Sequence, residues 1–184
     1  LRAIRSLSNT HVNLYSCFDK NLIPKIQEFE NVTPFCTNSP TAKACILEDD
    51  GKKTSVVDWG KQWISFFTVP KADWYHVSYL DKIENIESAK RLPKINSADL
   101  CSTNISSRVL DVIEHVDYLI ISDQEYKALE KVCIPFHLPK KGLIVHSPKK
   151  VQLFAEGEVY TFHNKNILNN IKIVGAGDTF VGVF

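Results

Sequence analysis

The chain has 184 residues, with 22 Lys and Arg against 21 Asp and Glu, which leaves a formal net charge of +1. This length is enough to bury a hydrophobic core, and 44% hydrophobic with 23% charged residues excludes a wholly disordered or collagen-like chain. The near-neutral charge gives no electrostatic case for nucleic acid or an anionic membrane, so neither is an expected partner.

The first third of the chain predicts a strand, a helix and a β-hairpin, in that order. Residues 11–17 alternate apolar and polar side chains as a strand does. Residues 19–29 carry apolar side chains at helical spacing, with Pro24 tolerated in the first turn. Residues 42–47 and 54–57 flank an Asp-Gly turn and therefore predict a β-hairpin.

The rest of the chain alternates strands with helices. We expect strands at 72–78, 94–100, 116–121 and 142–146, helices ending at 89 and spanning 106–115 and 124–131, a hairpin of 151–155 with 158–162, and a helix from Gly175 onward. The run at 116–121 is continuously apolar, which is typical of a strand buried on both faces of a parallel sheet. Trp74 and Tyr75 are expected in the core. This alternation predicts an α/β fold with a mostly parallel sheet in a single domain over 1–184.

Five cysteines at scattered positions, none in a CxxC pair, are expected to be reduced thiols. Residues 1–5 lack the apolar core of a signal peptide, and no window approaches about 18 consecutive apolar residues. We therefore expect a cytoplasmic protein without a transmembrane helix. The sequence contains no Met and starts at Leu1, so we interpret it either as a fragment of a longer protein or as a sequence from which some residues were dropped.

One segment near the carboxyl end carries a motif suited to chemistry. Gly175, Ala176 and Gly177 stand directly before Asp178 and an apolar helix start. Small residues leave backbone N–H groups uncovered, and such groups at a helix N-terminus bind anions. An acid beside them is placed to accept a proton from a hydroxyl group, a combination that suits phosphoryl transfer. The alternative is a simple turn in which Asp178 caps the helix.

Residues 175–180 resemble the C-terminal signature of the ribokinase-like carbohydrate kinases, the PfkB family. Segments 39–42, 49–52, 116–125 and 143–154 resemble further family elements, in the family's order. The resemblance thus spans most of the chain, and its strongly specific part is 175–180. It implies a ribokinase-like α/β fold, with a central mostly parallel sheet flanked by helices on both faces. The fold is expected to be incomplete at both ends, without the lid and the C-terminal helices.

The resemblance also implies an activity. Members of the family transfer the γ-phosphoryl group of ATP to a hydroxymethyl group of a sugar or nucleoside, with Mg²⁺. By resemblance, Asp178 is the catalytic base, and the amides of Gly175, Ala176 and Gly177 form the anion hole. Glu125 matches the acid that organises Mg²⁺, largely through water. The lid often forms a dimer in this family, which leaves a homodimer open here.

Two stretches depart from the family pattern around the nucleotide. Ser122 stands where the family has the Asn of Asn-x-x-Glu, and it still offers a hydroxyl to the nucleotide. Asp123 either compensates for the missing amide or is an ordinary surface acid.

Residues 146–151 replace the family's Thr-x-Gly-x-x-Gly, and Pro148 has no N–H to offer a phosphate. His146 and Lys149 are the nucleotide-binding candidates here, and the alternative is an exposed basic turn.

Asp99, at the end of a predicted parallel strand, is a candidate substrate-binding residue because α/β proteins bind ligands at such strand ends. The alternative is that Asp99 caps the next helix. The departures at Ser122 and Pro148 also support a second hypothesis, a non-catalytic homologue that binds a sugar or nucleotide or acts as an assembly partner.

Overall fold

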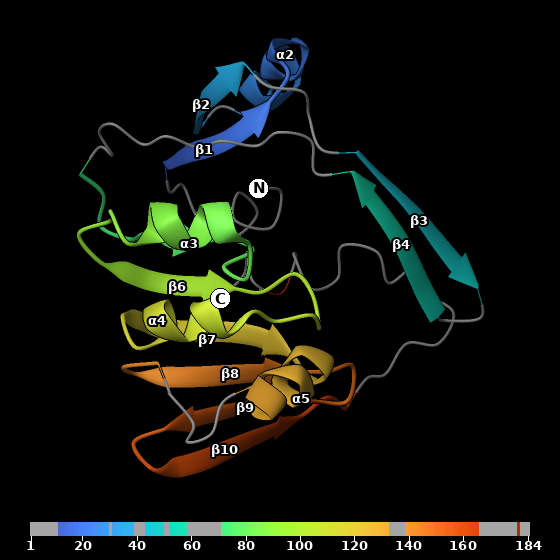
Figure 1. Cartoon of the computed structure of the whole chain (residues 1–184), viewed down its shortest axis with the longest axis vertical. Helices are drawn as coiled ribbons and strands as arrows, with labels where there is room; N and C mark the ends of the chain where they lie inside the picture. The colour runs from blue at the N-terminus through green and yellow to red at the C-terminus, as the bar shows by residue number, and fades with distance from the viewer. Residues whose placement is uncertain are drawn as a thin grey trace. The chain divides into compact units, whose positions relative to one another are not determined.

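The computed structural model describes residues 11–29, 31–38, 43–49, 52–58, 71–132, 139–165 and 180. The chain divides into two compact units, one of Leu1–Ser65 with Asn170–Phe184 and one of Phe66–Asn169, and each is described by itself (Figure 1). The expected single domain over 1–184 stays a prediction. The motif at Gly175–Asp178 and the helix expected there lie outside the described residues.

The first unit contains a parallel strand pair. Strand β1 (Val12–Phe18) pairs with β2 (Val32–Asn38), and the connection holds the short 3₁₀ helix η1 (Lys20–Leu22) and the helix α2 (Ile23–Gln27). The Asp19 carboxylate accepts a hydrogen bond from the Asn21 amide at 2.9 Å and so begins the helical segment. Pro24 lies in the first turn of α2, as expected. Strand β2 was not expected from the sequence, since Pro34 removes one ladder donor.

A separate hairpin joins β3 (Lys43–Asp49) to β4 (Lys52–Asp58). The antiparallel register pairs Asp49 with Lys52 and Lys43 with Asp58, so each end of the hairpin pairs an acidic with a basic residue in register. The predicted hairpin is therefore confirmed, with strands longer than expected.

The second unit is built on a six-stranded sheet in the order β10-β9-β8-β7-β6-β5. Strands β5 (His76–Val77), β6 (Ile95–Asp99), β7 (Val116–Ser122) and β8 (Gly142–His146) are parallel, whereas β9 (Lys150–Ala155) and β10 (Glu158–His163) run antiparallel at the end of the sheet. The mostly parallel sheet predicted from the sequence is confirmed.

Helices connect the parallel strands. They are α3 (Ile83–Ala89), the 3₁₀ turn η2 (Ser107–Val109) with α4 (Leu110–Ile113), and α5 (Asp123–Val132). Figure 1 shows α3, α4 and α5 on one face of the sheet. The helix expected at 106–115 is thus a 3₁₀ turn followed by one short α-helical turn. It begins where the Ser106 hydroxyl accepts a hydrogen bond from the Arg108 amide.

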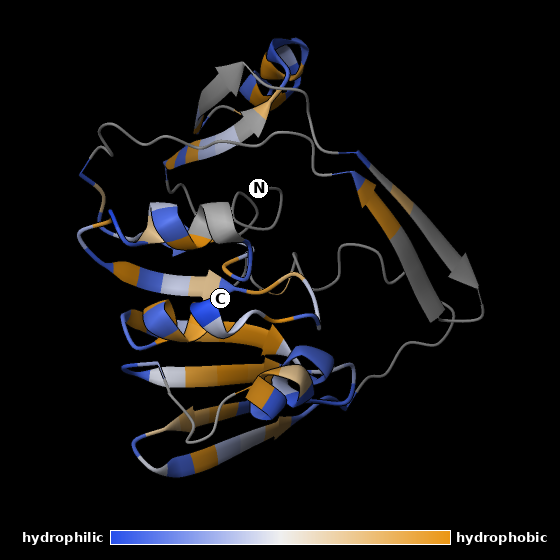
Figure 2. Cartoon of the chain, in the orientation of Figure 1, coloured by the Kyte–Doolittle hydropathy of each residue, from blue (hydrophilic) through white to orange (hydrophobic). Residues whose placement is uncertain are grey.

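The core lies between the helices and the centre of the sheet, where Figure 2 shows hydrophobic residues along β7 and β8. Leu119 and Ile121 belong to this core together with Leu143, and each is at most 1% exposed. Their neighbours Ile120 and Ile144 are paired in register and each 2% exposed, and successive side chains of a strand point to opposite faces. Strand β7 is therefore buried on both faces, as its apolar run predicts, and each such side chain contributes about 2 kcal/mol.

The strand expected at 72–78 shortens to two residues. The backbone of Tyr75 is engaged by Asn96, whose side chain accepts from the Tyr75 amide at 2.9 Å and whose amide donates to the Tyr75 carbonyl at 3.0 Å. Trp74 is 52% exposed, so its expected place in the core is wrong. Its indole N–H donates to Ser97 Oγ at 2.9 Å and its ring stacks on Tyr118, which satisfies the side chain at the sheet margin.

The turn between β9 and β10 has two residues with positive φ, Glu156 at 55° and Gly157 at 81°. Two such residues make the tight turn whose twist matches paired strands, so this predicted hairpin is confirmed. Within the described ranges, no helix combines the length and apolar character needed to cross a membrane.

Candidate functional site

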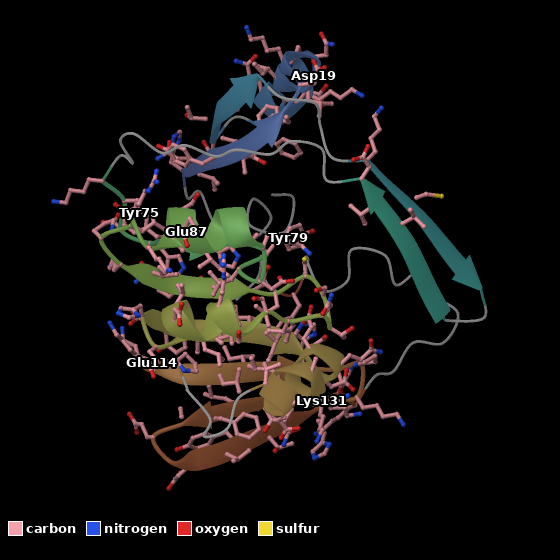
Figure 3. The ribbon with its side chains drawn as sticks, viewed as in Figure 1. Asp19, Tyr75, Tyr79, Glu87, Glu114 and Lys131 are labelled. Carbon is pink, nitrogen blue, oxygen red and sulfur yellow. The ribbon has the colours of Figure 1, made fainter. Side chains whose placement is uncertain are left out.

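Three of the expected site residues come together at the carboxyl edge of the parallel sheet. Asp99 ends β6, Ser122 ends β7 and His146 ends β8, and Ser122 pairs in register with His146. Figure 3 shows Tyr79 on the side where these strands end and Glu114 on the opposite side. Parallel strands place their carboxyl ends at one edge, where α/β proteins bind ligands.

The Asp99 carboxylate is held by groups that follow or belong to β5. Oδ1 accepts the Tyr79 amide at 2.7 Å, and Oδ2 lies 3.2 Å from His76 Nε2. The Asp99 carbonyl accepts the Leu80 amide at 2.8 Å. Asp99 therefore fixes the loop after β5. The expectation that it caps the next helix is wrong, because that helical segment is capped by Ser106.

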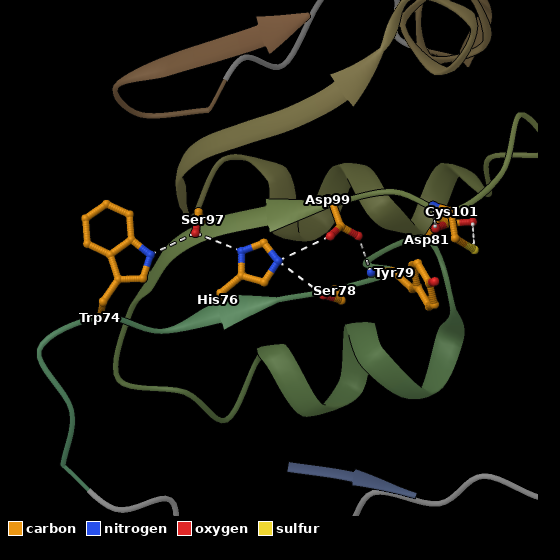
Figure 4. Close-up of polar contacts among 8 residues, drawn as sticks. All are labelled: Trp74, His76, Ser78, Tyr79, Asp81, Ser97, Asp99 and Cys101. Atoms are coloured by element: carbon orange, nitrogen blue, oxygen red, sulfur yellow. Dashed lines mark hydrogen bonds and ion pairs between the residues drawn. The ribbon is translucent and has the colours of Figure 1, made fainter. Parts of the chain in front are cut away.

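His76 lies at the centre of a polar network between β5 and β6 (Figure 4). Its Nδ1 is 2.8 Å from Ser97 Oγ, and its Nε2 is 3.2 Å from both Asp99 Oδ2 and Ser78 Oγ. Ser97, His76 and Asp99 thus resemble the contacts of a hydrolase triad. Ser97 is only 3% exposed and accepts the Trp74 indole N–H, so it is not placed to attack a substrate.

Ser122 and Glu125 bind each other at the start of α5. Glu125 Oε2 accepts the Ser122 amide at 2.7 Å and the Ser122 hydroxyl at 2.8 Å, and the Glu125 amide donates back to Ser122 Oγ at 3.3 Å. These reciprocal bonds form a capping box. The residues expected to bind nucleotide and Mg²⁺ therefore also begin the helix, and their ligand roles stay predictions.

Burial sets the charge of two groups at this edge. It raises the pKa of Glu125, against the two hydrogen bonds from Ser122, and the nearby charge of Asp99 raises it further. Burial lowers the pKa of His146, although Asp123 and Asp99 oppose that shift. His146 is therefore neutral at pH 7 and offers no positive charge at this edge.

Lys149 lies in a short exposed turn between β8 and β9. The turn is closed by the Ser147 amide, which donates to the Lys150 carbonyl at 2.9 Å, and by the Lys150 amide, which donates to Ser147 Oγ at 3.2 Å. Asn164, directly after β10, braces the turn by donating to the Pro148 and Lys149 carbonyls. This geometry matches the exposed basic turn, and it leaves the Lys149 ammonium in solvent.

A second buried acid lies beside the site. The Asp81 side chain is 1% exposed and accepts hydrogen bonds from the Cys101 amide at 2.8 Å and the Ser102 hydroxyl at 2.9 Å. Burial, with the charge of Asp81, raises the pKa of Cys101 to about 12. Cys101 is a free thiol held protonated, and Asp81 fixes the loop after β6.

The Glu125 carboxylate is of the kind that holds a hydrated Mg²⁺. No group of three or more His, Cys, Asp or Glu suited to a metal occurs among them. Mg²⁺ keeps several waters and is usually held by one or two carboxylates with phosphate oxygens. The Glu125 carboxylate at the start of α5 meets that requirement with its Oε1, since Oε2 is bonded to Ser122.

The sequence missed His76 and Tyr79. His76 was counted only among six dispersed histidines, and Tyr79 carried no signal. Both residues lie at or after the end of a predicted strand, and this position could have marked them as candidates. Their contacts with Asp99 could not be predicted without the register of β5 on β6, which pairs His76 with Ser97.

Neither the protein-family models nor the curated proteins give a match to this sequence. Solved structures do. Ribokinase from Thermotoga maritima matches with a TM-score of 0.73 at 20% identity, over 98% of this chain and 68% of that one. The chain has the ribokinase fold.

Two further structures agree. Adenosine kinase from Anopheles gambiae, in complex with P1,P4-di(adenosine-5) tetraphosphate, matches with a TM-score of 0.73 at 17% identity, over 99% of this chain and 69% of that one. A putative ribokinase II from E. coli, in complex with ATP and Mg²⁺, matches at 0.67 and 14% identity, over 98% and 70%. The chain thus spans about two thirds of each neighbour, and the likeness shows the ribokinase fold.

Proposed function

We propose that the protein is an ATP-dependent kinase that phosphorylates a hydroxymethyl group of a sugar or nucleoside. The observation that carries this proposal is the likeness to ribokinase and adenosine kinase over 98% and 99% of the chain. The polar side chains at the carboxyl edge of the sheet support it, because ligands of α/β proteins bind there. A cytoplasmic location and a homodimer stay predictions.

The motif at 175–178 is assigned to the direct transfer of the γ-phosphoryl group from ATP to the acceptor hydroxyl. The acceptor oxygen bonds to the γ-phosphorus while the bond from that phosphorus to the bridging oxygen of ADP breaks. Asp178 takes the proton of the acceptor hydroxyl, and the amides of Gly175, Ala176 and Gly177 stabilise the charge on the moving group. These roles rest on the resemblance of 175–180 to the family signature.

Four residues of the second unit are assigned to the nucleotide and its metal. Glu125 holds Mg²⁺ through water, and the bound ion supplies neutralisation of phosphate charge. The Lys149 ammonium, in its exposed turn, is assigned to the phosphates as a point charge. Ser122 and the neutral His146 contribute hydrogen bonds at the ends of β7 and β8.

Asp99 is assigned to the acceptor. Its side chain is 14% exposed at the carboxyl end of β6, so it is not fully enclosed by the protein. An ionised carboxylate has about four lone-pair positions, and the hydrogen bonds from Tyr79 and His76 use two. The others suit the hydroxyl groups of a sugar or ribose.

The test is Asp178→Asn in the full-length protein, with ATP, Mg²⁺ and a panel of sugars and nucleosides. Loss of the general base is expected to lower kcat by about 100-fold or more. Asp111→Asn, on the exposed side of α4, is the matched control for removal of a carboxylate and should retain wild-type activity. A near wild-type rate for Asp178→Asn would mean that the base is misassigned.

The hydrogen bonds between Ser122 and Glu125 favour a second candidate function, that of a homologue that does not catalyse phosphoryl transfer. In that case Oε2 of Glu125 serves the helix rather than the metal. Calorimetry of the full-length protein with ATP and Mg²⁺ separates the two. Binding with turnover supports the kinase, whereas a folded protein that binds neither nucleotide nor metal supports the second candidate.

A further inference from the structure

We propose that His76 is a positioning residue that holds the Asp99 carboxylate in the orientation in which it binds a hydroxyl group of the acceptor. The inference rests on the proposed function, and it assigns a role to a residue that contacts Asp99 rather than the substrate. Its starting point is the hydrogen bond between His76 Nε2 and Asp99 Oδ2 at 3.2 Å.

The sheet register brings the two residues together. Strand β5 pairs with β6 in parallel, with His76 opposite Ser97 and Val77 opposite Ala98. Ser97 and Asp99 are two residues apart on β6 and so point to the same face. The imidazole therefore spans both side chains, with one ring nitrogen on each.

The partners of Ser97 bear on which nitrogen of His76 carries the hydrogen. The Trp74 indole N–H is a donor only, and it donates to Ser97 Oγ at 2.9 Å. In the tautomer that the proposal assigns, the Ser97 hydroxyl donates to Nδ1, and Nε2 carries the hydrogen that it donates toward Asp99 Oδ2. With a partner at each ring nitrogen, His76 is held in one orientation rather than rotating at the surface.

A second contact restrains the other oxygen of the carboxylate. The Tyr79 amide donates to Oδ1 at 2.7 Å, and Tyr79 has a φ of 58°, which a non-glycine residue adopts only when its surroundings hold it there. The Leu80 amide donates to the Asp99 carbonyl at 2.8 Å. The carboxylate is thus held at one oxygen by a fixed backbone turn and at the other by His76.

The position of Asp99 gives this restraint a functional meaning. The charge of Asp99 is felt by both Glu125 and His146, so the carboxylate lies at the same edge as the residues assigned to the nucleotide and metal. The side chain of His76 is 29% exposed and that of Asp99 is 14% exposed. A ligand at this edge therefore reaches the carboxylate, and the imidazole sets its angle.

The test compares variants of the full-length protein by steady-state kinetics with the best acceptor of the panel. His76→Ala is expected to raise the KM for the acceptor about tenfold, while kcat and the KM for ATP stay within about twofold. Asp99→Asn is expected to raise the same KM at least as much. The double variant should be no worse than Asp99→Asn alone, because His76 acts through Asp99. His76→Gln, whose amide still donates, should recover part of the loss.

Two controls separate positioning from a general structural effect. Glu87→Gln alters an exposed pair with Lys90 on α3 and should leave all constants unchanged. Ser78→Ala removes the rival partner of Nε2, which lies at the same 3.2 Å, and should leave the acceptor KM within about twofold. If Ser78→Ala reproduces the His76→Ala effect, or if His76→Ala leaves the acceptor KM unchanged while Asp99→Asn raises it, the proposal is overturned.

A measurement without turnover completes the test. Nitrogen-15 NMR of the His76 ring should show the hydrogen on Nε2, and its signal should move in Asp99→Asn. A hydrogen on Nδ1 overturns the proposal even if the protein is an active kinase. Absence of phosphorylation by the wild-type protein overturns the proposed function instead, and the NMR result still decides whether His76 donates to Asp99.

Discussion

Ser122 Oγ lies 2.8 Å from Glu125 Oε2 and 3.3 Å from the Glu125 amide nitrogen, so each residue binds the other at the start of α5. The same Glu125 oxygen also accepts the Ser122 amide at 2.7 Å. A pattern that resembles a nucleotide-site element therefore has a complete structural role. Any effect of a substitution here on catalysis must be separated from its effect on helix stability.

Ser122→Ala removes the hydroxyl that caps α5. We expect the free energy of unfolding to fall by about 1 kcal/mol, the usual value for loss of an N-cap. Ser122→Asn, which introduces the Asn of the Asn-x-x-Glu pattern, should retain most of the stability because Asn also caps helices. Urea unfolding followed by circular dichroism measures both. Thr103→Ala, at an exposed loop position, is the control, and a loss for Ser122→Ala no larger than that of the control contradicts the capping role.

Glu125→Gln tests the effect of burial on the carboxyl group. Burial raises the pKa of Glu125, so between its ordinary pKa and the raised one the native state binds more protons than the unfolded state. The contribution of this group to stability is then present at low pH and is lost as pH rises through that window. Gln keeps the capping box without titrating.

The free energy of unfolding of Glu125→Gln minus that of the wild type should therefore rise with pH across the window and level off above it. Urea titrations at a series of pH values give this difference directly. A difference that stays flat or falls would show that the hydrogen bonds from Ser122, rather than burial, dominate the pKa.

Gly142→Ala tests the packing between β8 and β9. A Cβ at Gly142 would lie 3.0 Å from Leu153 Cδ1 and 3.3 Å from the Phe154 carbonyl oxygen. We expect a loss of about 1 kcal/mol in the free energy of unfolding, as for mild overpacking. Leu153→Ala is destabilising by itself, but it removes the tightest contact. In a double-variant cycle the two substitutions should couple favourably.

Gly157→Ala is the control for the double-variant cycle of Gly142→Ala with Leu153→Ala. Gly157 has a φ of 81°, and a Cβ added there would meet no described atom within 4 Å, so its substitution is costly through backbone conformation alone. It should lower stability by about 1 kcal/mol and show no coupling to Leu153→Ala. Equal coupling for both glycines would contradict a steric cause at Gly142.

Cys101 should resist alkylation. At pH 8 a thiol with a pKa of about 12 is ionised in about one molecule in ten thousand, and Cys101 is also half-buried. Cys45 is exposed on β3 and should react with iodoacetamide much faster. Peptide mass spectrometry at timed intervals compares the two. Asp81→Asn should speed the reaction of Cys101, and labelling of Cys101 as fast as Cys45 in the wild type would contradict the raised pKa.

Local patterns predicted most of the second unit. The apolar run at β7 predicted a strand buried on both faces, and the Glu156-Gly157 turn predicted its hairpin, because each depends on neighbouring residues. Trp74 was misplaced because it lies before the two-residue strand β5, and its contacts are with Ser97 and Tyr118 on other strands. β2 was missed because Pro34 argues against a strand except at an edge.

The candidate site was predicted in part for the same reason. Asp99 was found because ligands of α/β proteins bind where parallel strands end. Ser122 and His146 were found through the resemblance of their segments to family elements, and the structure places both at the ends of neighbouring strands. The contacts of His76 depend on the register of β5 on β6, which the sequence does not state. The Ser-x-x-Glu capping pattern was present in the sequence, but the resemblance to Asn-x-x-Glu gave it another interpretation.

The tight turn at Glu156-Gly157 has a consequence for the order of assembly. It lets Ala155 pair with Glu158 almost at once along the chain, whereas Ser122 and His146 are separated by α5 and its flanking segments. Hairpins close within about 1–10 μs, and pairing between distant strands is slower because a longer loop must first be closed. We therefore expect the antiparallel border of the sheet to pair before the parallel strands that carry the polar edge meet.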